Sequence, residues 1–319
     1  MRTPSVVALG GGHGLAVTLS AVSRYAGHVT AVVSVADDGG SSGRLRAFWP
    51  GPAPGDVRRC LLSLADDGPL EKLWAQVLDY RFTAGELAGH SLGNLVLMAL
   101  SEVTGDFAMA TAELGRLLGV TARVLPATLG TVDLCAEMET PQGRAEVTGQ
   151  AKVTHSPAPV RRVWLSPSSP DAPDEVLAAI AGADQVVLGP GSLFTSVLAV
   201  CAVPAIRRAL AERTGGRVYV CNLAPQEGET AGFDADAHLE ALAVHNVPVD
   251  TVVCDPSTRV GAPSGRIGVR SGAGVTSGAG TSHLAPGARV VTGVLAGPDG
   301  HSHNPAFLAE VLEALARTG

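Results

Sequence analysis

A buried strand that runs directly into a glycine-rich loop occurs twice near the start of the chain. Residues 6–9 lead into Gly10-Gly11-Gly12-His13-Gly14, and residues 29–35 lead into Ala36-Asp37-Asp38-Gly39-Gly40-Ser41-Ser42-Gly43-Arg44. Parallel sheets bind ligands beyond the carboxyl ends of their strands, where such loops lie. Glycines let backbone N–H groups approach a phosphate closely, and the N-terminus of the following helix adds partial positive charge. The pattern therefore predicts an α/β fold that binds a phosphorylated, nucleotide-like small molecule.

The composition limits the partners that such a chain can have. Of its 319 residues 46% are hydrophobic and 17% are charged, which is ordinary for a globular core, and the net charge is −7. A nucleic-acid-binding protein usually has a basic face, so we expect no nucleic-acid partner. Lys72 and Lys152 are the only lysines, so we expect backbone amides and a few arginines to hold a phosphate.

The cysteines and the apolar runs bear on the compartment. The five cysteines are odd in number and widely spaced, without a C-x-x-C pair, so we expect reduced cysteines in the core. The first apolar run is too short for a signal peptide, and no run reaches transmembrane length. We therefore expect a cytoplasmic protein without membrane insertion.

Alternating strand-like and helix-like segments predict the rest of the fold. Helices are expected at residues 56–65, 95–103, 174–180, 234–245 and 305–316, and later strands at 185–188, 217–221, 251–254 and 290–295. Residues 147–163 alternate in polarity, which predicts a hairpin or meander in a small β insertion around residues 120–165. Residues 261–280 are rich in Gly, Ser and Ala and predict a loop. We expect one α/β domain over residues 1–319, with a Rossmann-like, mostly parallel sheet and helices on both faces.

The first loop differs from the dinucleotide-binding fingerprint. Gly10, Gly12 and Gly14 give G-x-G-x-G, but Leu15 occupies the sixth position, where the fingerprint has glycine. This difference argues against a nicotinamide-dependent oxidoreductase. A glycine-rich turn after the first strand also occurs for steric reasons alone, so the loop predicts a phosphate site only through its strand–loop–helix context.

The second loop carries two adjacent acids, Asp37 and Asp38. At the end of a strand they are suited to hold ribose hydroxyls, or a metal ion on a phosphate. Capping is the alternative, since Asp favours turns and the hydroxyls of Ser41 and Ser42 favour the start of a helix. Arg44 and Arg46 are candidate phosphate clamps.

The segment Gly89-His90-Ser91-Leu92-Gly93 matches the G-x-S-x-G motif of hydrolases. That motif needs a strand directly before the serine, and residues 83–88 make a poor strand. We interpret Ser91 as the N-cap of a helix whose first turn, with Gly93 and Asn94, presents polar groups to a ligand. His90 is a phosphate donor, a base or a structural histidine.

Two later strands also end in loops with ligand-binding residue types. The strand at 185–188 opens onto Gly189-Pro190-Gly191-Ser192, and the strand at 217–221 onto Asn222, which is suited to contact a base or a ribose. Glu229 and Thr230 are either ligand contacts or a capping pair for the next helix. His238 lies within a predicted helix, and we expect it to be structural. Glycine- or Asn-bearing loops at several strand ends predict one shared site more strongly than any single loop does.

These motifs resemble those of the gluconeogenesis factor family (YvcK-like proteins), which is related to the 2-phospho-L-lactate transferases (CofD-like proteins). The resemblance spans nearly the whole chain and is carried by residues 10–15, 35–46, 54–58, 89–94, 188–196, 220–223 and 228–230. It implies a Rossmann-like fold and the binding of UDP-sugars such as UDP-N-acetylglucosamine. It also implies a role in cell-wall precursor supply, cell shape and growth on gluconeogenic carbon. The chain departs from the family at His13, at Glu227 and at Ser302-His303-Asn304.

The loops and the resemblance together define the candidate ligand-binding residues. These residues are Gly10, Gly11, Gly12, His13, Gly14, Asp37, Asp38, Ser41, Ser42, Arg44, Asp56, His90, Ser91, Gly93, Asn94, Gly189, Gly191, Ser192, Asn222, Gln226, Glu229 and Thr230.

The leading hypothesis is a nucleotide-sugar-binding protein without an established reaction. The alternative is a Mg²⁺-dependent phospho(lactyl)transferase acting on a nucleotide diphosphate-linked donor, in which Asp38 would be catalytic and would hold the metal. The related transferases tend to lack the Gly-Gly-Ser-Ser-Gly-Arg run after the acid, which disfavours that reaction. No other cofactor is expected, and a homodimer is compatible with the sequence although no motif predicts it.

Overall fold

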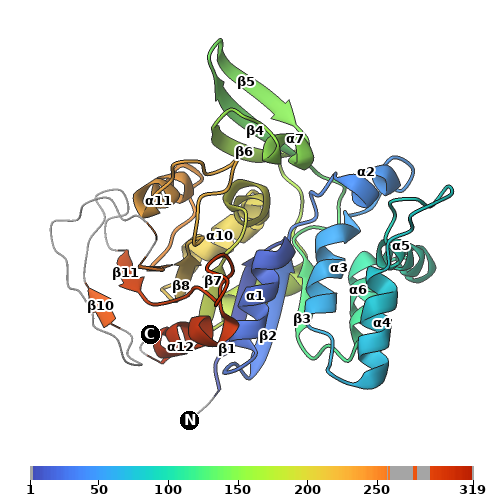
Figure 1. Ribbon diagram of the computed structural model, residues 1–319, viewed down its shortest axis with the longest axis horizontal. Coiled ribbons are helices and arrows are strands. Elements are labelled where there is room, and N and C mark those ends of the chain that lie inside the picture. Colours follow the sequence, from blue (N-terminus) through green and yellow to red (C-terminus); the bar gives the residue numbers. More distant parts are fainter. Residues whose placement is uncertain (1–2, 257, 259–275, 279–287, 318–319) are drawn as a thin grey trace.

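The computed structural model describes residues 3–256, 258, 276–278 and 288–317 (Figure 1). A large sheet of eight strands has the order β10-β11-β9-β8-β7-β1-β2-β3, and all neighbours are parallel except β10 and β11. Its strands are β1 (Ser5–Gly10), β2 (His28–Val33), β3 (Arg123–Pro126), β7 (Gln185–Leu188), β8 (Arg217–Val220), β9 (Thr251–Cys254), β10 (Thr276–Gly278) and β11 (Arg289–Thr292).

A second, antiparallel sheet of three strands has the order β5-β4-β6. Its strands are β4 (Asp133–Thr140), β5 (Gly143–Thr148) and β6 (Val160–Ser166). The helices are α1 (Gly12–Val22), α2 (Gly40–Arg46), α3 (Pro54–Ser63), α4 (Pro69–Asp79), α5 (Leu92–Thr104), α6 (Phe107–Leu117), α7 (Gln150–Thr154), α8 (Asp174–Gly182), the π-helix η1 (Leu193–Val197), α9 (Leu198–Cys201), α10 (Pro204–Glu212), α11 (Ala235–Val244) and α12 (Pro305–Ala316).

The strand order fixes where a ligand would bind. The chain builds β1, β2 and β3 outward in one direction and then returns to place β7 on the other side of β1. Such a reversal leaves the loops after two adjacent strands diverging to opposite faces of the sheet, which opens a site between them. Leu9 of β1 is level with both Val32 of β2 and Leu188 of β7. The loops after these three strands therefore start at the same edge.

The large sheet is covered by apolar side chains on both faces. In β8, Val218 and Val220 pack in a cluster with Leu308 and Leu312 of α12. Tyr219, which points to the opposite face, packs in the main cluster with Leu239 of α11. This alternation within a fully buried strand is what a parallel sheet between two helical layers requires. The expected fold, a mostly parallel Rossmann-like sheet with a small antiparallel addition, is confirmed.

Most of the expected elements are present. The helices expected at residues 95–103, 174–180, 234–245 and 305–316, and the strands at 185–188, 217–221, 251–254 and 290–295, match α5, α8, α11, α12, β7, β8, β9 and β11 within a few residues. All five cysteines are free and buried, as expected. Within the described residues no single helix is long and apolar enough to cross a membrane, although the bent pair Leu193–Cys201 and Pro204–Glu212 passes the same test together.

The expected β insertion is present, but its internal structure differs. Residues 147–163 do not form a hairpin, because α7 lies between the end of β5 and the start of β6. The hairpin is β4–β5, which turns at residues 141–142, and β3 belongs to the large sheet. Most of the loop expected at residues 261–280 lies outside the described residues, and residues 276–278 of it form β10.

His238 stabilises the core as a neutral side chain. Its ring is buried in α11, with Nδ1 2.7 Å from the hydroxyl of Tyr219, which supports the structural role expected for it. Burial lowers its pKa from 6.5 to about 4. The unfolded chain therefore takes up the proton first when the pH falls below about 6.5.

This difference predicts an acid-sensitive fold. The free energy of unfolding is expected to be full above about pH 6.5 and to fall by about 3 kcal/mol as the pH approaches 4. Denaturant unfolding at a series of pH values measures the loss. His238→Asn is expected to flatten this pH dependence, and His28→Gln, at an exposed histidine, is expected to retain it. An equal pH dependence in His238→Asn and the parent would contradict the prediction.

Candidate functional site

The loops after β1 and β7 touch one another at the point where the strand order reverses. The hydroxyl of Thr18 in α1 donates a 2.7 Å hydrogen bond to the carbonyl of Gly189. A Cβ atom on Gly14 would lie only 2.1 Å from the carbonyl oxygen of Pro190, so residue 14 has to be glycine for this contact. Gly191 has φ +134°, a conformation that also favours glycine. The two glycine loops thus form one continuous backbone surface.

Asp56 reaches this surface from α3. The helix expected from residue 56 begins two residues earlier, at Pro54 with Ala53 as N-cap, so Asp56 lies in its first turn. Its carboxylate is buried against the first glycine loop, where the backbone N–H of Gly12 helps to oppose a rise of its pKa. Arg59, one turn later in α3, forms an ion pair with Asp56 and lies 4.0 Å from the carboxylate of Asp37. Burial raises the pKa of Asp56, and the charge of Arg59 opposes that rise.

The N-terminus of α1 therefore already faces one internal anion. The first-turn amides of a helix have no intrahelical partner, and the carboxylate of Asp56 lies nearest to Gly11 and Gly12, so the N–H groups of His13 and Gly14 are the ones that a ligand would use. The side chain of His13 is exposed beside them.

Asp37 orders the loop after β2. One of its carboxylate oxygens accepts the backbone N–H of Gly39 at 2.9 Å, and the other accepts the hydroxyl of Ser42 at 2.9 Å. A Cβ atom on Gly55 would lie 2.3 Å from the same carboxylate, so α3 packs tightly onto it. These contacts favour the capping interpretation of Asp37, and a ribose or metal contact stays a prediction.

Asp38 faces the insertion instead of the glycine loops. Its Oδ1 accepts the backbone N–H of Ala151, at the start of α7, at 2.8 Å. The other oxygen, Oδ2, would lie 2.4 Å from a Cβ atom on Gly149. Arg59 already lies between Asp37 and Asp56, and among the described residues no three His, Cys, Asp or Glu side chains are grouped as metal ligands. A Mg²⁺ ion on Asp38 stays a prediction. In the structure the carboxylate of Asp38 binds the backbone of the insertion at Ala151.

A buried polar cluster joins the second loop to α5. The hydroxyl of Ser41 lies 3.1 Å from Nδ1 of His90 and accepts a 3.1 Å hydrogen bond from the amide nitrogen of Asn94. Ser91 is the N-cap of α5, as expected, but its side chain makes no capping bond. Its hydroxyl and Oδ1 of Asn94 are buried without a partner among the residues that the structure describes. Burial, followed by the charges of Arg44 and Arg81, lowers the pKa of His90.

The candidate arginines of the second loop bind backbone. Arg44 donates a 2.7 Å hydrogen bond to the carbonyl of Ala88, which holds the segment before His90 in place. Arg46 donates to the carbonyl of Val132 and to the carboxylate of Asp133, at the start of the insertion. A phosphate contact of Arg44 or Arg46 stays a prediction.

Asn222, at the end of β8, positions the loop after β7. Its Oδ1 accepts the N–H of Gly191 at 2.9 Å, and its Nδ2 donates to the carbonyl of the same residue at 3.0 Å. Nδ2 also lies 3.3 Å from Oε1 of Gln226. The side chain that was expected to contact a base or a ribose is thus engaged with backbone.

Glu229 and Thr230 support the helix that follows Ser192. Glu229 is buried, and its Oε2 accepts the N–H groups of Phe194 and Thr195 at 3.1 and 3.2 Å. Thr230 accepts the N–H of Gln226 at 2.9 Å. The pair does not cap the next helix, since α11 has Asp234 as its N-cap and Glu229 binds the start of η1 instead. A ligand contact stays a prediction.

The structure thus brings the candidate residues to one edge of the sheet in two adjoining groups. The first group consists of the two glycine loops, Gly10–Gly14 and Gly189–Ser192, with Asp56 and Asn222. The second group is the polar cluster of Ser41, His90, Ser91 and Asn94. Arg59, which pairs with Asp56 and lies 4.0 Å from Asp37, was missed by sequence reasoning. Its spacing of three residues from Asp56 on a helix was the available signal.

The close contact of the two loops predicts an intolerant position. Gly14→Ala is expected to lower the free energy of unfolding by about 1–3 kcal/mol, because the methyl group overlaps the carbonyl of Pro190. Gly182→Ala is the matched control, since a Cβ atom at this exposed α8 position meets no atom within 4 Å. It should be neutral or stabilising by up to about 1 kcal/mol. Equal stability of the two variants in denaturant unfolding would contradict this contact.

Comparison with known proteins places the chain in a family. The sequence model of the family described as 2-phospho-L-lactate transferase CofD matches residues 6–262. A putative gluconeogenesis factor from Mycobacterium tuberculosis is 48% identical over 248 residues, covering 76% of this chain and 72% of that protein. The gluconeogenesis factor of Bacillus subtilis is 42% identical over 245 residues, covering 76% and 75%. A crystal structure of a UPF0052 family member from Bacillus halodurans superimposes with a TM-score of 0.82 and 34% identity, covering 98% of this chain and 99% of that one. The chain therefore belongs to the gluconeogenesis factor family, within the proteins that the CofD model describes.

Proposed function

We propose that this chain is a cytoplasmic nucleotide-sugar-binding protein whose ligand is a UDP-sugar such as UDP-N-acetylglucosamine. Its role would link carbon metabolism to cell-wall precursor supply and cell shape, as the family resemblance implies. The observation that carries the proposal is the contact between the two glycine loops where the strand order reverses, with Thr18 bonded to Gly189 at 2.7 Å. A site of this kind suits a diphosphate flanked by two larger groups.

The diphosphate would lie across the two loops. The amides of His13 and Gly14 face it from the N-terminus of α1, where the helix dipole favours negative charge. The backbone around Gly191 faces it from the other side, held by Asn222. Asn222 is thus a positioning residue in this proposal, because it acts through Gly191.

The sugar or the nucleoside would extend toward the polar cluster of α5. Buried polar atoms are nearly always paired, so the unpartnered hydroxyl of Ser91 and Oδ1 of Asn94 mark a place where a ligand hydroxyl or a water is needed. Arg59, whose side chain is 34% exposed, offers a guanidinium between Asp37 and Asp56. The preference for uridine rests on the family resemblance.

The proposal predicts that a methyl group between the loops weakens binding. Gly191→Ala would place a Cβ atom 3.5 Å from Cα of Gly14, where the diphosphate is expected, and should weaken UDP-N-acetylglucosamine binding at least about tenfold. Gly143→Ala is matched in backbone strain, since Gly143 has φ +113°, but it lies in the β4–β5 turn with no atom within 4 Å. Isothermal titration calorimetry measures both variants.

Two calorimetric results would contradict the proposed function. One is the absence of binding heat with any UDP-sugar at protein concentrations well above micromolar. The other is equal affinity of Gly191→Ala and Gly143→Ala, which would place the ligand away from the glycine loops.

A further inference from the structure

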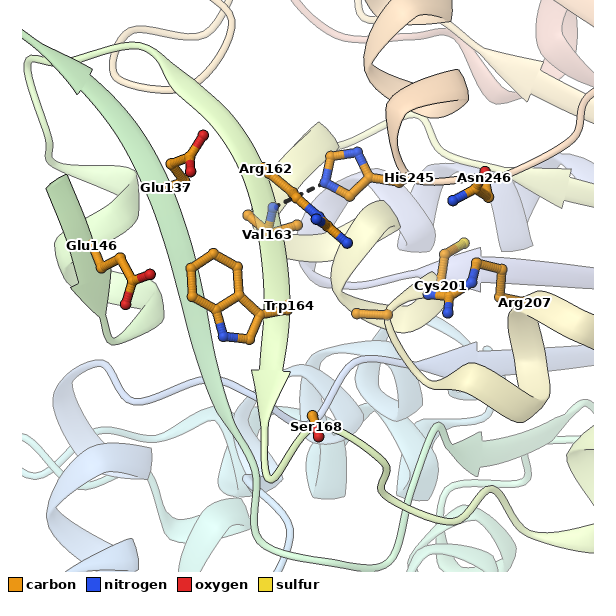
Figure 2. A pocket seen from close by; sticks show the side chains of 11 residues that line it. Glu137, Glu146, Arg162, Val163, Trp164, Ser168, Cys201, Arg207, His245 and Asn246 are labelled. Atoms are coloured by element: carbon orange, nitrogen blue, oxygen red, sulfur yellow. Dashed lines mark hydrogen bonds between the residues drawn. The ribbon is translucent and has the colours of Figure 1, made fainter. Parts of the chain in front are cut away.

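A cavity of about 450 Å³ lies outside the site described above, between the small sheet and the helices after η1 (Figure 2). Its walls come from β6, with Arg162 and Trp164, and from α9, α10 and the end of α11, with Arg207 and His245. None of its lining residues belongs to the glycine loops or to the α5 cluster. The small sheet and the helices α9, α10 and α11 thus form a second cavity.

Two arginines extend into this space without a charged partner. Figure 2 shows Arg162 from β6 and Arg207 from α10 pointing into the gap between the small sheet and the helices. Neither forms an ion pair or a side-chain hydrogen bond with another residue that the structure describes. Burial is the main cause that lowers the pKa of His245, and the charges of Arg162 and Arg207 lower it further. Both guanidinium groups are therefore near the His245 ring. Two converging guanidinium groups are suited to bind one phosphate or carboxylate.

His245 closes this end of the cavity as a neutral wall. Its Nε2 lies 2.9 Å from the backbone nitrogen of Val163 and accepts that N–H, so the proton of the neutral ring is on Nδ1. Nδ1 donates in turn to the carbonyl of Ala241 at 2.6 Å. Both ring nitrogens are therefore occupied, and the positive charge that faces the cavity here comes from the arginines.

The wall that the small sheet contributes to the cavity also carries acidic and aromatic side chains. Glu137 of β4 pairs in register with Arg162 of β6 and with Glu146 of β5, so these side chains share one face of the small sheet with Trp164. Glu137 lies 3.5 Å from Arg161, whereas Glu146 has no ion pair among the described residues. A ligand with negative charge at one end only fits this arrangement, because carboxylates repel a second anion and accept hydrogen bonds from hydroxyls.

We propose that this cavity binds a small phosphomonoester, with its phosphate between Arg162 and Arg207 and its hydroxyl-bearing end toward Glu137 and Glu146. The cavity lies between the small sheet and the helices α10 and α11. A bound ligand would therefore connect the small sheet to these helices. It is separate from the nucleotide-sugar site and does not depend on it.

Trp164 allows a local test of this proposal. The chain has three tryptophans, so Trp49→Phe and Trp74→Phe leave Trp164 as the only indole and as a reporter inside the cavity. In this background the fluorescence of the full chain is titrated with inorganic phosphate and with glucose 6-phosphate, against sodium chloride of equal ionic strength. We expect saturable changes with both probes, and tighter binding of glucose 6-phosphate because its hydroxyls reach the glutamates.

Variants of the two arginines test whether the phosphate binds between them. Arg162→Gln and Arg207→Gln are each expected to weaken glucose 6-phosphate binding about tenfold, the loss of one charged hydrogen-bonding group. Arg208→Gln, at the exposed neighbouring position of α10, is the matched control and should leave binding unchanged. Thermal unfolding of each variant confirms that it is folded.

Three results would overturn the proposal. They are a fluorescence change no larger than that with sodium chloride, unchanged affinity in Arg162→Gln and Arg207→Gln, or equal affinity for the two phosphate probes. Each titration is repeated with saturating UDP-N-acetylglucosamine. Because Trp164 reports on this cavity alone, a failure here is distinguishable from a failure of the nucleotide-sugar proposal.

Discussion

The contact between the loops after β1 and β7 is the constraint on which the rest of the site depends. Gly14 lies so close to Pro190 that no side chain fits there, and Thr18 ties the same helix to Gly189. This contact is possible because β1 and β7 are neighbours in the sheet although they are far apart in sequence. The strand order thus decides that two glycine loops, each unremarkable alone, share one surface.

The carboxylates around this surface mostly hold backbone in place. Asp56 packs against the first glycine loop beside Gly11, and Asp38 accepts an amide of α7. Glu229 accepts two amides at the start of η1. Each carboxylate fixes a helix start that carries or adjoins the proposed site, as expected for anions at helix N-termini. Because these contacts already order the loops, the loops lose little conformational entropy when a ligand binds, which favours binding.

The sequence predicted what local patterns can encode. The apolar runs and glycine loops gave the large sheet and its ligand edge, because strand ends and glycine positions are local features. The partners of acidic side chains were not predictable in this way. Asp38 accepts a hydrogen bond from Ala151, 113 residues away in the sequence, and Glu229 accepts one from Thr195, 34 residues away. Likewise α7 lies where a hairpin was expected, and the N–H of Ala151 in its first turn is bound by the distant Asp38.

Hydrogen–deuterium exchange with and without UDP-N-acetylglucosamine tests the central claim most directly. The account predicts that the ligand slows amide exchange in residues 11–16 and 189–193 together, because one diphosphate contacts both loops, while exchange in α12 is unchanged. Protection of only one of the two segments, or of neither while the sugar nucleotide is bound, would contradict the shared surface on which the account rests.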